Sequence, residues 1–330
     1  MAELFNKDGL ILSAAYANTM EKVALPYLTA RRTDETVSGY DGKPLFTSRY
    51  RADKNVYGSA ILVHGFTENG DKYAEIIYSL LQNGFDVLIY DQRGHGRSWR
   101  DERLKDDSLV HVARFAEYEK DLEAVLTAME GKLNKPYSVF CHSMGGAVTA
   151  LLLEKRQDVI ARAALCAPMI APNRRGMPYW LCKTVTGGLR LIGKGRSRLF
   201  LSKPYSERET FEGACSTGKE RFEWYSGVKD ANPKFHNNGP SYGWMLEALN
   251  ITRTLLKAGA VEKIACPVKI YSADDDWEVI NEYQQRFAAR LKQGSIQTVP
   301  HSRHEIYRSE DETLFPWWSD VLRFLRGEQA

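Results

Sequence analysis

The serine within residues 141–146 (CHSMGG) has the surroundings that covalent catalysis requires. Residues 137–141 are predicted to form a strand and residues 145–154 a helix, so that Ser143 occupies the turn between them. In a nucleophile elbow this turn is strained, and small residues flank the serine because neighbouring backbone passes close. Gly145 and Gly146 meet that demand, whereas Cys141 stands where glycine is usual. The pattern predicts that Ser143 is the nucleophile of an acyl-transfer reaction.

A serine hydroxyl needs a general base, and the base needs a group that orients it and stabilises its charged form. Two later segments, 272–277 (SADDDW) and 300–305 (PHSRHE), follow predicted strands and supply an acid and then a histidine. Ligand sites of α/β sheets gather at the carboxyl ends of strands, where both segments begin. From the residues alone, the candidates stay open: Asp274, Asp275 or Asp276 for the acid, and His301 or His304 for the base.

Acyl transfer also requires hydrogen-bond donors aimed at the oxyanion that develops in the transition state. Residues 63–67 (VHGFT) follow a predicted strand, so we expect the Phe66 amide to be one donor and the Met144 amide to be the other. His64 is interpreted as a structural hydrogen-bonding residue. The sequence shows no metal-ligand constellation and no phosphate-binding loop, so neither a metal nor a cofactor is expected.

The elements that must position these residues alternate between strand and helix from about residue 35, which is the pattern of a mostly parallel sheet covered by helices. An opening hairpin is expected around the turn 41–44 (DGKP). The further predicted strands and helices, in chain order, are 59–63, 72–82, 86–90, 116–129, 137–141, 145–154, 161–165, 267–271, 281–291, 295–299 and 314–325. We therefore expect an α/β protein with helices on both faces of its sheet.

The alternation stops between residues 171 and 250, which are rich in Gly, Pro, Trp and Tyr. We interpret 171–250 as an inserted, mobile helical cap, and residues 1–170 and 251–330 as the core. The insertion carries thirteen basic and seven acidic residues, a net charge of +6. Eight of the basic residues and no acidic one lie in 171–205, interleaved with apolar side chains. This pattern is typical of a surface that contacts anionic lipid headgroups, and a solvated basic face is the alternative.

The whole chain of 330 residues has an ordinary globular composition, with 43% hydrophobic and 26% charged residues and a net charge of +3. This argues against disordered, collagen-like and nucleic-acid-binding proteins. The five cysteines form no CxxC pair and are expected to be reduced thiols. The start of the chain lacks the basic segment of a signal peptide, and no apolar run reaches the roughly 18 residues of a membrane span. We expect a cytoplasmic protein, with at most peripheral contact at the inner face of the membrane.

Together these motifs resemble the α/β-hydrolase superfamily, and within it the lysophospholipase and monoacylglycerol-lipase group, which is also described as serine-aminopeptidase-like. The resemblance covers residues 35–327. Its most specific part is the segment 91–98 (DQRGHGRS), which matches the group's DxRGxGxS loop, alongside 64–66 (HGF) and 142–146 (HSMGG). The resemblance implies the α/β-hydrolase fold with an inserted helical cap, and a loop 91–98 that braces the site rather than acting in it.

The resemblance also distinguishes between the candidate acids. In this group the acid lies nine residues after the proline that opens its strand, in a GxxDxxV context. Here that proline is Pro267, and the segment 273–279 (ADDDWEV) has Ala273 in place of the glycine. The resemblance therefore implies that Asp276 is the acid.

The base follows in the same way from the group's GxxHE motif. The segment 301–305 (HSRHE) matches that motif with His301 in place of the glycine, so that the catalytic histidine is His304. The resemblance thus implies a triad of Ser143, Asp276 and His304.

The resemblance implies a substrate as well, an ester of glycerol with one long acyl chain. We expect a serine hydrolase that cleaves lysophospholipids or monoacylglycerols through an acyl-enzyme. One alternative is an esterase of small esters or an aminopeptidase-type amidase, and transfer of the acyl group to another alcohol is also open. A non-enzymatic protein that binds a small hydrophobic ligand is disfavoured because the triad is intact.

Overall fold

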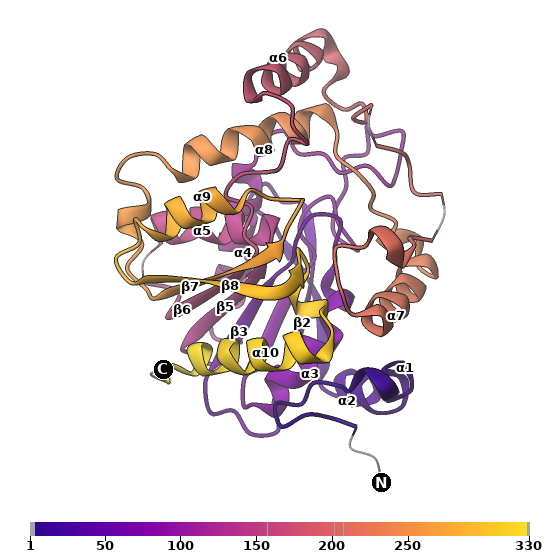
Figure 1. The fold of residues 1–330 in the computed structure, drawn as a ribbon, viewed down its shortest axis with the longest axis vertical. Helices are drawn as coiled ribbons and strands as arrows, with labels where there is room; N and C mark the ends of the chain where they lie inside the picture. Colours follow the sequence, from indigo (N-terminus) through magenta and orange to yellow (C-terminus); the bar gives the residue numbers. More distant parts are fainter. Residues whose placement is uncertain (1–3, 157, 201, 207, 329–330) are drawn as a thin grey trace.

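The computed structural model describes residues 4–156, 158–200, 202–206 and 208–328 (Figure 1). Its described part contains an eight-stranded sheet in the order β1-β2-β4-β3-β5-β6-β7-β8. The first two strands form the expected antiparallel hairpin and β2 is antiparallel to β4, whereas the pairs that follow are parallel. The strands are Arg32–Ser38 (β1), Pro44–Tyr50 (β2), Ser59–Val63 (β3), Asp86–Tyr90 (β4), Tyr137–His142 (β5), Arg162–Cys166 (β6), Val268–Asp275 (β7) and Gly294–Arg303 (β8).

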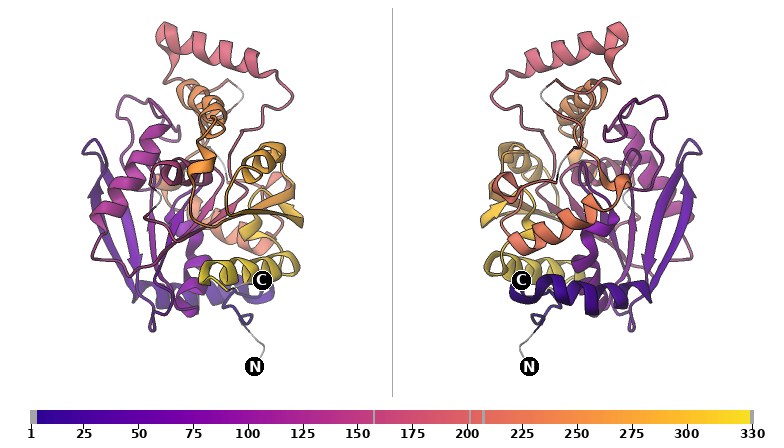
Figure 2. Two further views of the ribbon diagram at one scale, coloured as in Figure 1. Left: turned by 90° about the vertical axis from the view of Figure 1, so that its left-hand side faces the viewer. Right: turned by 90° about the vertical axis from the view of Figure 1, so that its right-hand side faces the viewer.

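Helices cover both faces of this sheet, as Figures 1 and 2 show. They are Tyr16–Thr19 (α1), Leu25–Thr29 (α2), Ala74–Gln82 (α3), Ala116–Ala128 (α4), Met144–Lys155 (α5), Tyr179–Leu189 (α6), Lys219–Asp230 (α7), Tyr242–Leu255 (α8), Asn281–Ala288 (α9) and Asp311–Arg326 (α10). Short 3-10 or π turns are Ser13–Ala15 (η1), Met20–Ala24 (η2), Gly70–Tyr73 (η3), Arg190–Lys194 (η4), Phe211–Gly213 (η5), Pro233–Phe235 (η6), Val261–Lys263 (η7) and Ile306–Arg308 (η8). None of the helices in the described ranges combines the length and hydropathy that crossing a membrane would need.

The sheet separates two hydrophobic cores because side chains alternate between the faces of a strand. In β3, Ile61 and Val63 pack into the core that α4, α5 and α8 cover. Ala60 and Leu62 face the other core, beneath α3, α10 and the N-terminal helices. All five residues of β3 are buried, which explains why the central parallel strands read as continuous apolar runs in the sequence.

The helical segment at the start of the chain was not among the predicted elements, which began near residue 35. Residues Tyr16, Met20, Ala24 and Leu28 are buried at four-residue spacing and pack on the core beneath α3 and α10. That spacing is a helical signal. The helix is divided at η2 and restarts with a proline in its first turn, so the apolar stripe runs through three short pieces rather than one long helix.

The segment between β6 and β7 is largely helical and divides into an outer and an inner part. The outer part, α6 and η4, stands away from the sheet in every view, and Thr186 is the buried residue of α6 (Figures 1 and 2). The inner part includes α7, where the buried guanidinium of Arg221 contacts Glu75 of α3 at 2.9 Å and Asp311 of α10 at 2.8 Å. The inner part is therefore bound to the core by a buried charged side chain. Glu207, counted among the seven acids of the insertion, lies outside the described residues.

Candidate active site

Ser143 lies in a tight turn between β5 and α5. Its backbone has φ 51° and ψ −116°, a conformation that costs free energy for any residue with a side chain. A Cβ atom on Gly145 would lie 2.1 Å from the carbonyl oxygen of Val63, and one on Gly146 would lie 2.5 Å from Pro168. Neighbouring backbone therefore requires glycine at these two positions, as the sequence predicted.

Cys141 occupies the position before this turn where glycine is usual. Its side chain is fully buried, and its thiol lies 3.7 Å from the carbonyl oxygen of Ala164 in the next strand. Burial raises the pKa of the Cys141 thiol to about 12, so this side chain is neutral at physiological pH. The thiol fills the space as a small apolar group.

Three side chains far apart in the sequence converge at the carboxyl ends of β5, β7 and β8. The hydroxyl of Ser143 lies 2.8 Å from Nε2 of His304, and Nδ1 of His304 lies 2.8 Å from Oδ2 of Asp276. All three side chains are nearly or completely excluded from solvent. Because Nδ1 faces an acceptor-only carboxylate, it carries the proton in the neutral ring, which leaves Nε2 to accept the proton of Ser143.

The electrostatics of the pair favour a charged carboxylate and a readily protonated imidazole. Burial disfavours protonation of His304, but the carboxylate of Asp276 outweighs it, so that the pKa of His304 is raised above its ordinary value. Burial likewise disfavours the charged form of Asp276, yet His304 and the amides of Glu278 and Val279 lower its pKa. Those amides donate to Oδ1 at 2.9 and 3.1 Å and leave Oδ2 for the histidine.

The neighbouring candidate residues occupy different places. The carboxylate of Asp274 accepts hydrogen bonds from the amides of His301 and Ser302, at 2.8 and 2.9 Å. Asp275 is exposed and lies 3.9 Å from Arg303. His301, where the motif has glycine, has a positive φ of 56° at the irregular end of β8, and its side chain is exposed to solvent.

The two expected oxyanion donors stand beside the serine. Phe66 follows β3 and lines the same cavity as Ser143, and Met144 is the first residue of α5. Within the described ranges, neither amide has a hydrogen-bond acceptor. Thr67, next to Phe66, has a positive φ of 60°, so this turn is strained in the same way as the one at Ser143.

The loop 91–98 supports the turn after β3 from behind. The buried Asp91 carboxylate accepts the amides of Gly70 and Arg97, at 2.7 and 2.8 Å. The amide of Gln92 donates to Nε2 of His64 at 2.9 Å. Among the described residues, those that line the cavity at Ser143 include none from this loop. The loop contacts the turn after β3 through His64 and through the ring of His95, whose centroid lies 5.9 Å from that of Phe66.

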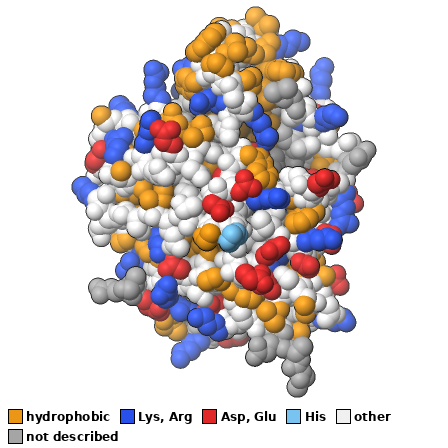
Figure 3. Space-filling model, in the orientation of Figure 1, with side chains coloured by type: hydrophobic (Ala, Val, Ile, Leu, Met, Phe, Trp, Pro, Cys, Tyr) orange, Lys and Arg blue, Asp and Glu red, His pale blue; other side chains and the backbone are white. Residues whose placement is uncertain are grey.

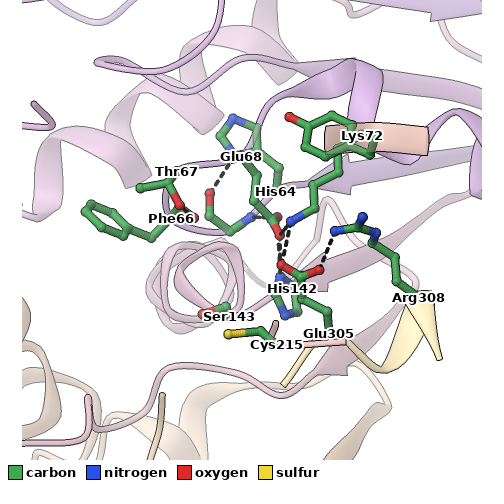
Figure 4. Close-up of polar contacts among 12 residues, drawn as sticks. His64, Phe66, Thr67, Glu68, Lys72, His142, Ser143, Cys215, Glu305 and Arg308 are labelled. Carbon is green, nitrogen blue, oxygen red and sulfur yellow. Dashed lines mark hydrogen bonds and ion pairs between the residues drawn. The ribbon is translucent and has the colours of Figure 1, made fainter. Parts of the chain in front are cut away.

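A buried charge cluster at one wall of the site was not predicted from the sequence. Glu68 and Glu305 alternate with Lys72 and Arg308, and all four side chains are less than 15% exposed (Figure 4). A carboxylate three residues after Gly65 with a lysine four residues further on was the available signal.

The cavity that contains Ser143 and His304 has a volume of about 620 Å³ and two kinds of wall. On the side of α8 and of the loop after β6 it is mainly apolar, with Phe66, Met169, Pro172, Trp244, Met245 and Val279, and Asn173 and Arg175 lie at its edge. On the side of α7 and of the loop after β8 it carries the charged residues Lys72, Glu209, Lys229, Glu305 and Arg308 beside Phe222 and Tyr225. Within the described residues, no three His, Cys, Asp or Glu side chains converge as metal ligands would.

Comparisons with known proteins give the family. The family model described as serine aminopeptidase, S33, matches residues 54–312. Lysophospholipase L2 of Escherichia coli (strain K12) is 31% identical over 268 residues, 78% of this chain and 74% of that protein. Monoglyceride lipase of Mus musculus is 27% identical over 135 residues, 40% of this chain and 42% of that protein.

A solved structure gives the fold independently. The soluble variant of monoglyceride lipase from Saccharomyces cerevisiae, in complex with a substrate analogue, has a TM-score of 0.69 at 17% identity, over 90% of this chain and 97% of that one. The mostly parallel sheet with helices on both faces is thus the α/β-hydrolase fold, which confirms the expected fold class. This chain belongs to the serine aminopeptidase S33 family of α/β-hydrolases, and within it to the lysophospholipase and monoacylglycerol-lipase-like group of carboxylic ester hydrolases.

Proposed function

We propose that this protein hydrolyses carboxylic esters of lipids that carry one acyl chain, either lysophospholipids or monoacylglycerols. The observation that carries the proposal is the two-walled cavity around Ser143. An apolar wall suits an acyl chain and a charged wall suits a polar headgroup, and the scissile ester of such a lipid joins the two parts. The names of the relatives, lysophospholipase L2 and monoglyceride lipase, support the same substrate class.

The proposed reaction begins with attack of the Ser143 hydroxyl oxygen on the acyl carbonyl carbon. Nε2 of His304 takes the hydroxyl proton, and the carbonyl oxygen becomes an oxyanion that the amides of Phe66 and Met144 bind. As the tetrahedral intermediate collapses, the ester C–O bond breaks and His304 gives its proton to the leaving alcohol. The acyl group is then bonded to Ser143.

Water completes the cycle in the proposed second half-reaction. Its oxygen attacks the acyl carbon while His304 takes one of its protons, and the fatty acid leaves as the serine recovers that proton. Asp276 holds the tautomer of His304 in both halves and stabilises the imidazolium that forms twice. The geometry supports this role, because the hydroxyl, the ring and the carboxylate are joined by two contacts of 2.8 Å.

We further propose that residues 171–250 act as a cap and that its outer part, α6 and η4, contacts the surface from which the lipid is drawn. Three large apolar side chains there are largely exposed to solvent, Trp180 by 67%, Leu191 by 89% and Ile192 by 71%, and Phe200, which follows η4, is exposed by 69%. Hydrophobic side chains gather over the same end of the molecule in Figure 3, with lysine and arginine beside them. Exposed aromatic and aliphatic groups of this size are typical of membrane-interface segments.

The net charge of residues 171–205 is smaller than their composition suggests. Four of the eight basic residues in 171–205 pair with carboxylates: Arg175 with Glu278, Arg190 with Glu247, Arg196 with Asp101 and Arg198 with Asp106. Paired arginines attract an anionic surface weakly. The remaining basic side chains are Arg174, Lys183, Lys194 and Lys203, so apolar contact is expected to contribute more than charge to binding.

A substrate panel tests the proposed function. The purified protein is given lysophosphatidylethanolamine, monooleoylglycerol, p-nitrophenyl butyrate and leucine p-nitroanilide, with Ser143→Ala as the control. We expect the highest kcat/KM on one of the two lipids and no hydrolysis of any of the four substrates by Ser143→Ala. Highest activity on the aminoacyl amide or on the short aryl ester would instead support an amidase or a small-ester esterase, and activity that persists in Ser143→Ala would exclude the serine mechanism.

A further inference from the structure

The carboxylate of Glu68 lies where the three loops of the candidate site meet. Its Oε2 accepts a hydrogen bond of 2.6 Å from the amide of Gly65, in the turn that carries Phe66. Its Oε1 accepts one of 2.7 Å from the hydroxyl of Tyr307, just after His304. It also lies 3.2 Å from Nδ1 of His142, the residue before Ser143 (Figure 4). One side chain thus contacts the oxyanion turn, the nucleophile turn and the histidine loop.

This carboxylate is buried and charged at the same time. The side chain of Glu68 is only 2% exposed. Burial opposes its ionisation, but Lys72, at 2.9 Å, and His142 outweigh burial and hold the pKa of Glu68 well below its ordinary value. A carboxylate has no proton to donate, so it accepts from the Gly65 amide and from the hydroxyls of Tyr73 and Tyr307 at once.

The bond to Gly65 acts on the orientation of the Phe66 amide. Nε2 of His64 accepts the amide of Gln92, so Nδ1 carries the proton and donates to the carbonyl of Gly65 at 2.7 Å. Glu68 holds the other side of the same residue through its amide. The peptide between Gly65 and Phe66 is planar and trans, so its N–H points opposite to the carbonyl that His64 binds. The oxyanion donor therefore faces away from His64.

A second chain of contacts runs from Glu68 to the base. Nδ1 of His142 faces Glu68, and Nε2 of His142 lies 3.0 Å from the carbonyl oxygen of His304. The ring centroids of His142 and His304 are 4.7 Å apart. A Cβ atom on Gly65 would lie 2.8 Å from His142 and 2.9 Å from Glu68, so these groups are packed without room for adjustment. A displacement of Glu68 would therefore move His142 and the backbone of His304.

We propose that Glu68 is a positioning residue for catalysis. It orients the Phe66 amide toward the oxyanion and holds the backbone of His304 where the imidazole can reach the hydroxyl of Ser143. The inference rests on the proposed function only in assuming that Ser143 attacks an acyl carbonyl; it does not depend on which acyl ester is cleaved.

The test compares Glu68→Gln with the unmodified protein on p-nitrophenyl butyrate, a short ester that requires the serine chemistry but not the lipid cavity. An amide side chain turns two donor hydrogens toward groups that are themselves donors, so the turn is expected to shift. We expect kcat to fall about 10²-fold, as when one oxyanion donor is lost, with KM changed less than threefold. Affinity for an alkyl boronic acid, which forms a tetrahedral adduct with serine, should fall by the same factor as kcat/KM.

Two further measurements separate positioning from general damage. Binding of the uncleavable ether analogue of the ester should be unchanged, because the ground state does not use the oxyanion donors. The matched control is Glu119→Gln: Glu119 is equally buried and also pairs with a lysine, Lys155, at the end of α5 remote from Ser143. It should change thermal stability without changing kcat.

The proposal is overturned if kcat of Glu68→Gln falls no more than that of Glu119→Gln, or if the boronic acid and the ether analogue lose affinity equally. Should Glu68→Gln not fold, Glu68→Asp replaces it; the charge is kept but the carboxylate is withdrawn by one methylene. A wild-type kcat in Glu68→Asp would overturn the proposal. If the unmodified protein hydrolyses the aryl ester but no lipid, the proposed lipid substrate is wrong and the proposal for Glu68 can still be tested. If it hydrolyses neither the aryl ester nor a lipid, both the proposed function and the proposal for Glu68 are overturned.

Discussion

Asp274 binds the backbone of His301, with Oδ2 2.8 Å from the His301 amide nitrogen. Its other oxygen accepts the amide of Ser302 at 2.9 Å. The pairing of β7 with β8 shifts register between Ala273 and Asp275, and this irregularity turns the Asp274 carboxylate toward the neighbouring strand. A carboxylate two residues before the proposed catalytic acid therefore shapes the turn that presents His304.

Replacing Asp274 by alanine should remove both hydrogen bonds from this turn. We expect Asp274→Ala to lower the free energy of unfolding by about 1–3 kcal/mol, because two amides lose their acceptor, and to lower kcat as His304 moves. The control is Asp275→Ala, because Asp275 is exposed like Asp274 but accepts neither of these amides, so it should contribute within about 0.5 kcal/mol. Urea unfolding gives the free energy of unfolding of both variants. Equal effects of the two substitutions would show that Asp274 has no special place in the turn.

A second prediction about stability follows from the positive φ of His301. Glycine adopts φ 56° without the Cβ strain that any other residue pays. We expect His301→Gly to be more stable than His301→Ala by about 1 kcal/mol, although glycine is usually the less stable of the two. Thermal unfolding of the pair decides this. If the alanine variant is the more stable, the turn does not require a left-handed residue.

The raised pKa of His304 predicts the pH dependence of hydrolysis. Only the neutral ring can take the proton of Ser143, so kcat/KM should fall as the pH drops through a pKa above the ordinary histidine value of 6.5. In Asp276→Asn the carboxylate that raises this pKa is gone while burial remains. The acid limb should then move to lower pH, and the plateau should fall about 10⁴-fold.

Rates on the short aryl ester between about pH 5 and 9 give both profiles. An acid limb that keeps its position in Asp276→Asn would mean that another group titrates, and a plateau within tenfold of the unmodified protein would remove Asp276 from the mechanism.

The outer part of the cap should bind lipid vesicles mainly through its apolar side chains. We expect the triple variant Trp180→Ser, Leu191→Ser, Ile192→Ser to lose cosedimentation with vesicles of phosphatidylglycerol and phosphatidylethanolamine while keeping its kcat on the soluble aryl ester. The variant Lys183→Gln, Lys194→Gln should weaken binding less, with a smaller dependence on salt. Equal binding by the triple variant and the unmodified protein would contradict a membrane contact at α6.

The sequence predicted most of the sheet because buried parallel strands are short apolar runs between turns. The strands 59–63 and 86–90 were predicted with the bounds that β3 and β4 have. The geometry at Gly145 and Gly146 was also predictable, since a close backbone approach leaves no alternative to glycine.

Contacts between distant segments were not predictable in the same way. Glu68 meets Tyr307 across 239 residues and Arg221 meets Glu75 across 146, and neither pair has a local signal. The choice of Asp276 among three consecutive acids likewise came from the resemblance, because only the register of β7 against β8 separates their side chains in space. The ion pairs that neutralise half of the basic residues in 171–205 were also not predictable, because their partners are distant in the sequence.

The most direct test of the account is covalent labelling with a fluorophosphonate, followed by mass spectrometry of the peptides. The proposed triad predicts one adduct per chain, on Ser143, formed at a rate that falls by orders of magnitude in His304→Ala and absent from Ser143→Ala. An adduct on another residue, or none on folded protein that hydrolyses an ester, would contradict it.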